Sequence, residues 1–172
     1  LYGKYTMNTA TATALNAETI TEYDFVIGLD ASGSMASPST RYPGKTRWQE
    51  AQETIFGLAS VLGQYDSDGI DVVVFGGSVE VFEGVTPDKV SAIFAQRSPR
   101  GSTPLNDAVV QTIKGMQGKV KRGQRALLVI MTDGYENASQ TPSAEVAALV
   151  AEREAEGWAF IYLGADHDAW AQ

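Results

Sequence analysis

Short apolar runs alternate with amphipathic helical segments along most of the chain, and this alternation limits its fold more than any other feature. The run at 25–29 and the longest run, at 126–131, have the length of buried strands and are too short to cross a bilayer. Further strands are predicted at 70–75, 79–82 and 160–163. Because strands that alternate with helices form α/β folds, we expect a doubly wound, mainly parallel central sheet with helices on both faces.

Threonine marks the start of each predicted helix. Thr46 begins one, and Gln49 three residues later completes a capping box. The other starts are Thr-Pro pairs, in which proline takes or adjoins the first helical position. The pairs lie at 86–87, 103–104 and 141–142. The last two are predicted to begin helices that run over 105–120 and as far as 156.

One domain preceded by an arm accounts for the rest of the pattern. Residues 1–22 are poorly patterned, and the Thr-Ala repeats within them favour an arm or an added edge strand. Residues 23–172 form the domain, in which Gly76-Gly77 predicts a hairpin turn and therefore one antiparallel edge strand. After residue 164 we expect a turn into a cut-off helix, so that the final helix of the domain is lacking or truncated.

Composition argues against several classes of protein. The net charge of −8 does not suit a nucleic-acid binder, which needs a basic face. The sequence contains no cysteine, so disulfides and thiolate metal sites are excluded. No basic segment followed by an apolar one begins the chain, so we expect no signal peptide and favour a cytoplasmic setting.

Oxygen-bearing side chains follow the predicted strands where ligands bind in open α/β sheets, beyond the carboxyl ends. Asp30, Ser32 and Ser34 follow the first strand, and Asp133 follows the fourth. Thr103 precedes a helix and is expected at the same rim. A set of oxygen ligands alone selects a hard cation, Mg²⁺ above all, with Mn²⁺ or Ca²⁺ as alternatives. The sequence therefore predicts a metal site made of these five residues.

The ligand types also predict an open position on the ion. If the three hydroxyls touch the metal directly, its immediate ligands are largely neutral, and Asp30 and Asp133 act partly through water. An ion held in this way keeps a position for a carboxylate from another protein.

The segment Asp30-Ala31-Ser32-Gly33-Ser34 resembles the Asp-x-Ser-x-Ser motif of the von Willebrand factor type A family, which includes the integrin I domains. Thr103 and Asp133 match the family's later threonine and aspartate, and the similarity spans residues 23 to 165. The resemblance implies a Rossmann-like fold and a metal ion-dependent adhesion site that holds Mg²⁺. It also implies a function in adhesion or assembly, not catalysis, with a partner protein that donates a Glu or Asp carboxylate. In some members the last helix slides, a switch that the truncated end puts in doubt here.

The loops at the predicted rim carry candidates for partner contact. Tyr42 and Tyr135 are favoured because tyrosine is common at interfaces. Arg100 and Ser102 lie in the loop before the helix at 105–120. Other roles stay open: Ser102 replaces Thr103 as ligand if the loop is offset by one residue, and the Thr103 hydroxyl can instead cap its helix.

Two catalytic alternatives fit the sequence less well. Ser32, Asp133 and His167 follow the chain order of an α/β-hydrolase triad, but a nucleophile elbow needs Gly-x-Ser-x-Gly, and Asp30 would repel an oxyanion. Phosphoryl transfer at Asp30 wants a second acid where Ser32 stands. A structural subunit stabilised by a cation is a further alternative, within the binding class.

Overall fold

The computed structural model describes residues 20–120, 125–133 and 138–164. Most of the predicted arm, and the predicted cut-off helix after residue 164, lie outside the described residues. The described strands are β1 (Tyr23–Asp30), β2 (Ile70–Phe75), β3 (Val79–Val85), β4 (Arg125–Thr132) and β5 (Ala159–Gly164). The described helices are α2 (Arg47–Leu62), α3 (Pro87–Gln96), α4 (Leu105–Val120), α5 (Ser143–Ala155) and the short 3-10 helices η1 (Ile20–Glu22) and η2 (Gly33–Ala36).

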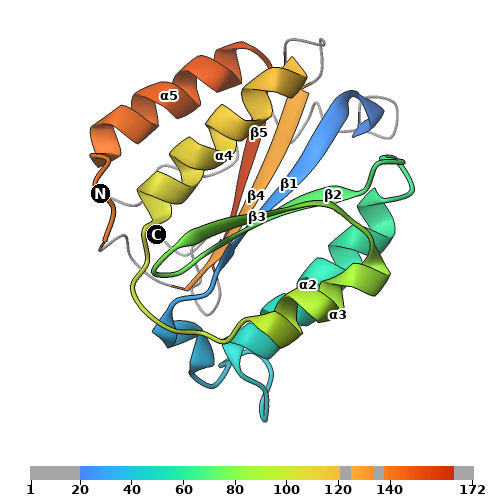
Figure 1. Ribbon diagram of the computed structural model, residues 1–172, viewed down its shortest axis with the longest axis vertical. Coiled ribbons are helices and arrows are strands. Elements are labelled where there is room, and N and C mark those ends of the chain that lie inside the picture. The colour runs from blue at the N-terminus through green and yellow to red at the C-terminus, as the bar shows by residue number, and fades with distance from the viewer. Residues whose placement is uncertain (1–19, 121–124, 134–137, 165–172) are drawn as a thin grey trace.

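The strands form one sheet in the order β3-β2-β1-β4-β5. β1 pairs in parallel with β2 and β4, β4 pairs in parallel with β5, and β2 pairs antiparallel with β3. This order confirms the predicted doubly wound sheet with one antiparallel edge strand. Since β1 is central and its neighbours run the same way, the carboxyl ends of β1, β2 and β4 lie at one edge of the sheet (Figure 1).

The edge strand β3 extends to Val85, beyond the predicted end at Phe82. The extension pairs Val85 with Ile70 across an irregularity in the ladder. There Gly84 adopts a φ of 58° and donates its N–H to Oδ1 of Asp71 at 3.1 Å. A glycine with positive φ beside a bulge interrupts the alternation on which a strand prediction depends.

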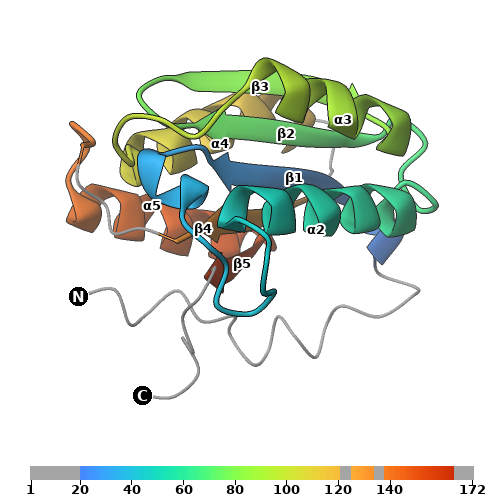
Figure 2. The ribbon, with the colours of Figure 1, turned by 90° about the horizontal axis from the view of Figure 1, so that it is seen from below.

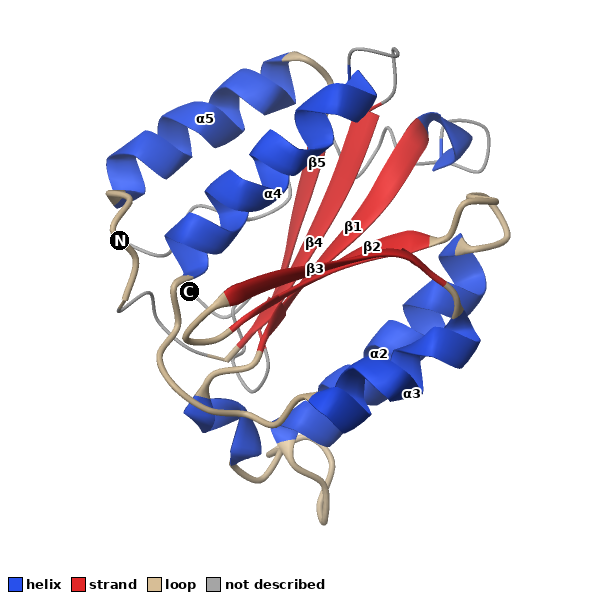
Figure 3. Ribbon diagram, in the orientation of Figure 1, coloured by secondary structure: helices blue, strands red, loops and turns tan. Residues whose placement is uncertain are grey.

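Helices cover both faces of the sheet, as predicted. α2 and α3 pack on one face, and α4 and α5 pack on the other (Figure 3). In the described residues no helix is long and apolar enough to cross a bilayer.

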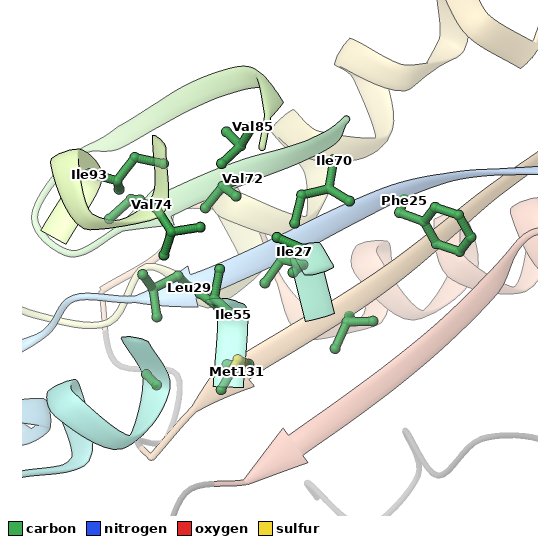
Figure 4. Packing of buried hydrophobic residues seen from close by; sticks show 14 of the residues in the cluster. Phe25, Ile27, Leu29, Ile55, Ile70, Val72, Val74, Val85, Ile93 and Met131 are labelled. Atoms are coloured by element: carbon green, nitrogen blue, oxygen red, sulfur yellow. The ribbon is translucent and has the colours of Figure 1, made fainter. Parts of the chain in front are cut away.

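Buried side chains alternate between two core clusters along the strands. Phe25, Ile27 and Leu29 of β1 pack beneath α2 and α3, where Figure 4 shows Ile27 and Leu29 near Ile55. Val26 belongs to the cluster beneath α4 and α5. Both faces of β1 are therefore dry, which explains why its sequence is continuously apolar instead of alternating. Truncating Ile27, which is fully buried, to alanine is expected to cost about 2–5 kcal/mol.

The predicted capping box fixes the start of α2, beside the edge of the sheet at which β1, β2 and β4 end. The Thr46 hydroxyl accepts the Gln49 N–H at 3.2 Å, and the Gln49 side chain accepts the Thr46 N–H at 2.9 Å. The α4 boundaries agree with the prediction, whereas α5 spans 143–155 because Pro142 is its N-cap and not its first residue. Figure 2 shows that the loop between η2 and α2 projects away from the sheet.

Candidate metal site

Asp30 is the last residue of β1 and lies fully buried at the edge of the sheet where β1, β2 and β4 end. Its Oδ1 accepts the backbone N–H of Ser32 at 2.7 Å, and its Oδ2 accepts the Thr132 hydroxyl at 2.5 Å. The first bond shapes the turn after β1, and the second ties that turn to the end of β4. Asp30 therefore shapes the turn after β1 and also joins two segments of this edge.

The electrostatics at Asp30 favour a nearby cation. Burial raises the pKa of Asp30 above its ordinary value, and the hydrogen bonds from Thr132 and Ser32 offset this only in part. The negative charge of Asp133 raises the pKa further. A positive charge nearby would favour the ionised form of Asp30 and so offset the effect of its burial.

Two serine hydroxyls connect this turn to Asp133. The Ser32 and Ser34 Oγ atoms lie 3.0 Å apart, and the Ser34 hydroxyl donates to Oδ1 of Asp133 at 2.7 Å. Ser32 precedes η2 as its N-cap residue but makes no side-chain capping bond, so its hydroxyl stays within the cluster. Buried Met35 holds η2 against the core. Four of the five predicted ligands are thus connected by hydrogen bonds.

The fifth predicted ligand, Thr103, is carried to the same edge by backbone bonds of its loop. The Gly33 N–H donates to the Gly101 carbonyl at 3.1 Å, and the Gly77 N–H donates to the Ser102 carbonyl at 3.2 Å. Thr103 is buried, whereas Ser102 is exposed. The loops after β1 and β2 therefore hold the segment on either side of Gly101 beside the serine cluster.

Arg47 is a member of the site that the sequence did not indicate. It is the first residue of α2, and its Nη1 donates to Oδ2 of Asp133 at 2.5 Å. The Asp133 side chain is fully buried, and that of Arg47 is 22% exposed. A cation in the first turn of a helix opposes the helix dipole, and that local anomaly was the available signal.

The oxygen set fits a magnesium ion. In octahedral Mg²⁺ sites with bonds of 2.0–2.1 Å, neighbouring ligand oxygens lie about 2.9 Å apart. The separations of 3.0 Å between the serine hydroxyls and 2.7 Å between Ser34 and Asp133 are hydrogen-bond distances, and they are also close to this value. The described residues contain no group of three or more His, Cys, Asp or Glu side chains suited to a metal, so this set depends on its hydroxyls.

Three of the four predicted partner contacts lie in described loops, and each of them is exposed. Tyr42 is 46% exposed, and Arg100 and Ser102 are also exposed. Tyr135 lies outside the described residues, as does His167 of the hydrolase alternative. The Asp133 carboxylate is engaged by Ser34 and Arg47.

The chain belongs to the von Willebrand factor type A domain family, whose sequence model matches residues 25–136. The matched segment begins in β1 and includes the whole candidate site. Domains of this family are protein-interaction modules, so the resemblance noted in the sequence is confirmed at the level of family and fold. No curated protein sequence matches the chain.

Solved structures show the same fold. The SpRpn10 VWA domain superposes with a TM-score of 0.58 at 16% identity, over 86% of this chain and 78% of that one. Proximal thread matrix protein 1 from the mussel byssus gives 0.54 at 20% identity, over 83% and 37%. The Ro protein of Deinococcus radiodurans gives 0.54 at 18% identity, over 84% and 27%. The chain thus spans most of the first structure but much less than two thirds of the other two.

Proposed function

We propose that the chain binds one divalent cation, Mg²⁺ above all and Mn²⁺ or Ca²⁺ as alternatives, and uses it to hold a Glu or Asp side chain of a partner protein. The proposed ligands are Asp30, Ser32, Ser34, Thr103 and Asp133. The observation that carries the proposal is the connected chain of oxygens from Ser32 through Ser34 to Asp133, whose hydrogen-bond spacings are also compatible with the ligands of a hard ion.

The donor types support capture of a carboxylate. Both oxygens of Asp30 already accept hydrogen bonds, so it is suited to act on the ion through water or through a remaining lone pair. The serine hydroxyls are neutral ligands, which leave the ion able to attract an anion. Ser34 is exposed, so the oxygen chain reaches the surface at the point where a partner would approach.

The loops around the oxygen chain support a protein partner that carries acidic groups. Arg100 is exposed and forms no ion pair within the described residues. Its backbone N–H donates to the Ala31 carbonyl at 2.8 Å, which anchors the residue beside the turn after β1. We propose Tyr42, Arg100, Ser102 and Tyr135 as partner contacts. A hydrolase is less well supported, because the Ser32 hydroxyl contacts Ser34 and Asp133 is bonded to Arg47.

The first test is stabilisation by Mg²⁺. Ligand that binds only the folded state raises the melting temperature, so saturating Mg²⁺ is expected to raise that of the wild-type chain. Asp30→Asn, which keeps the shape of the side chain, is expected to remove most of this shift. Asp68→Asn changes the same charge at an exposed turn far from the site and should respond like the wild type. Equal shifts in all three proteins would contradict the proposed site.

The second test separates partner capture from structural stabilisation. Immobilised wild-type chain is expected to retain a partner with Mg²⁺ and to release it on adding a chelator, whereas Asp30→Asn retains none. If Mg²⁺ stabilises the chain but capture is indifferent to the chelator, the ion has a structural role only.

A further inference from the structure

One cation of the chain already contacts a proposed ligand of the candidate metal site. Nη1 of Arg47 lies 2.5 Å from Oδ2 of Asp133, a carboxylate whose side chain is fully buried. We propose that Arg47 is a built-in cation that competes with the divalent ion for Asp133 and thereby sets the metal affinity of the site. This inference rests on the proposed function.

The two carboxylate oxygens of Asp133 face different partners. Oδ1 accepts the Ser34 hydroxyl at 2.7 Å and faces the serine cluster, while Oδ2 is held by the guanidinium. A divalent ion among the serine hydroxyls approaches Asp133 from the Oδ1 side. Its double charge repels the guanidinium across one carboxylate, so the ion must weaken the Arg47 contact or bind less tightly because of it.

A basic side chain at position 47 does not stabilise α2. α2 is already capped by Thr46 and Gln49, and a positive charge in its first turn opposes the helix dipole. The backbone N–H of Arg47 is used by the Ser37 carbonyl at 3.0 Å, independently of the side chain. The ion pair with Asp133 is what offsets the unfavourable placement.

The buried carboxylates of Asp30 and Asp133 need a positive charge nearby even when no metal is bound. Asp30 and Asp133 are both buried, and a buried carboxylate without a partner is strongly destabilising. Arg47 supplies one positive charge where a divalent ion supplies two. In the metal-free protein the Asp133 carboxylate therefore keeps its ion pair with Arg47. The divalent ion binds in competition with that ion pair and does not enter a site whose carboxylates lack a positive partner.

The test is a comparison of metal affinity and metal-free stability. By titration calorimetry, Arg47→Gln is expected to bind Mg²⁺ and Mn²⁺ at least about tenfold more tightly than the wild type, because the repelling charge is gone. Its metal-free form is expected to melt at a lower temperature. Arg47→Lys keeps the charge and should stay within about threefold of the wild-type affinity. Arg125→Gln, at the start of β4, removes an exposed arginine paired with Glu22 and should leave the affinity unchanged.

The outcomes separate this inference from the function beneath it. If the wild type binds Mg²⁺ and Arg47→Gln binds it equally or more weakly, the competition is disproved and the metal site stands. If only Arg47→Gln binds, the inference is supported, and Arg47 replaces the ion in the wild type. If neither binds, both proposals fall.

A measurement on the wild-type chain guards against misfolding of the variant. Nitrogen-15 NMR of the arginine side chains is expected to show the Arg47 guanidinium signal moving as Mg²⁺ is added. An Arg47 signal that stays in place when the site is saturated would overturn the inference.

Discussion

The Ser34 hydroxyl donates a 2.7 Å hydrogen bond to Oδ1 of Asp133, which stands 99 positions later in the chain. Ser34 is exposed, and the Asp133 side chain is fully buried. The bond thus connects the surface of the site with its interior. Loss of the Ser34 hydroxyl should therefore affect ion binding far more than folding.

Ser34→Ala is expected to weaken Mg²⁺ binding by at least about tenfold, the equivalent of one lost ligand. The metal-free melting temperature should fall by no more than about 4 °C, because one partly exposed hydrogen bond contributes about 1 kcal/mol. Titration calorimetry and thermal melts measure the two effects. Ser91→Ala on the exposed face of α3 is the matched control. An unchanged affinity in Ser34→Ala would remove Ser34 from the ligand set.

Gly76→Ala is expected to destabilise the protein by about 1–3 kcal/mol and to weaken Mg²⁺ binding. A Cβ at Gly76 would lie 2.6 Å from the Ala31 carbonyl carbon and 3.0 Å from the Ser32 nitrogen, so the turn after β1 would have to move. Gly57 in α2 has open space where a methyl group would lie, and Gly57→Ala should stabilise the helix by about 0.5–1 kcal/mol. Urea denaturation compares the two. A neutral Gly76→Ala would show that the turn is pliable.

Glu50→Ala is expected to cost about 1–3 kcal/mol, because this buried carboxylate accepts the Ser39 hydroxyl at 2.7 Å. Ser39 in turn accepts the backbone N–H groups of Arg41 and Tyr42, so the projecting loop depends on Glu50. Glu53→Ala, on the same helix, breaks only an exposed pair with Lys45 and should change stability by less than about 1 kcal/mol. Similar losses of stability in the two variants would argue against a buried anchor.

Asp107 is expected to stabilise the protein in a pH-dependent way. Burial alone raises the pKa of Asp107, but hydrogen bonds from the Thr141 hydroxyl and from the N–H groups of Gln140 and Thr141 outweigh it, and the pKa is lowered. A lowered folded-state pKa contributes stability that is present above the unfolded value, about 3.9, and is lost as the pH falls through the folded value.

Asp107→Asn should therefore be less stable than the wild type at pH 7, by about 1–2 kcal/mol. The gap should close as the pH falls through the lowered pKa, and urea denaturation at a series of pH values measures it. Asp68→Asn, at an exposed position, is the control. A gap that stays constant down to acid pH would assign the loss to shape instead of charge.

The fold was largely predictable because local signals agreed with it. The alternation of apolar runs with capped helices identified the parallel sheet, and the capping box at Thr46 and Gln49 is present as predicted. The prediction failed where a glycine suspends the strand pattern, at Gly84. A bulge is visible only once the partner strand is known.

The candidate site was predictable in part. Its hydroxyl and carboxylate positions follow from where strands end, which the sequence reveals. The Arg47 pair with Asp133 joins residues 86 positions apart, and nothing local to either residue specifies the other. The bonds of Asp107 likewise cross to a segment more than 30 residues away. Contacts of this kind depend on how loops pack once the sheet has formed.

The backbone of Ala31 is bonded on both sides to other loops. Its N–H donates to the Phe75 carbonyl at 2.7 Å, and its carbonyl accepts the Arg100 N–H at 2.8 Å. The conformation of the short segment from Asp30 to Ser34 therefore depends on these two other parts of the chain. Grafting it onto an unrelated sheet would transfer the sequence without the neighbouring residues that orient it. An engineer would have to move the loop after β1 together with the end of β2 and the loop that contains Arg100.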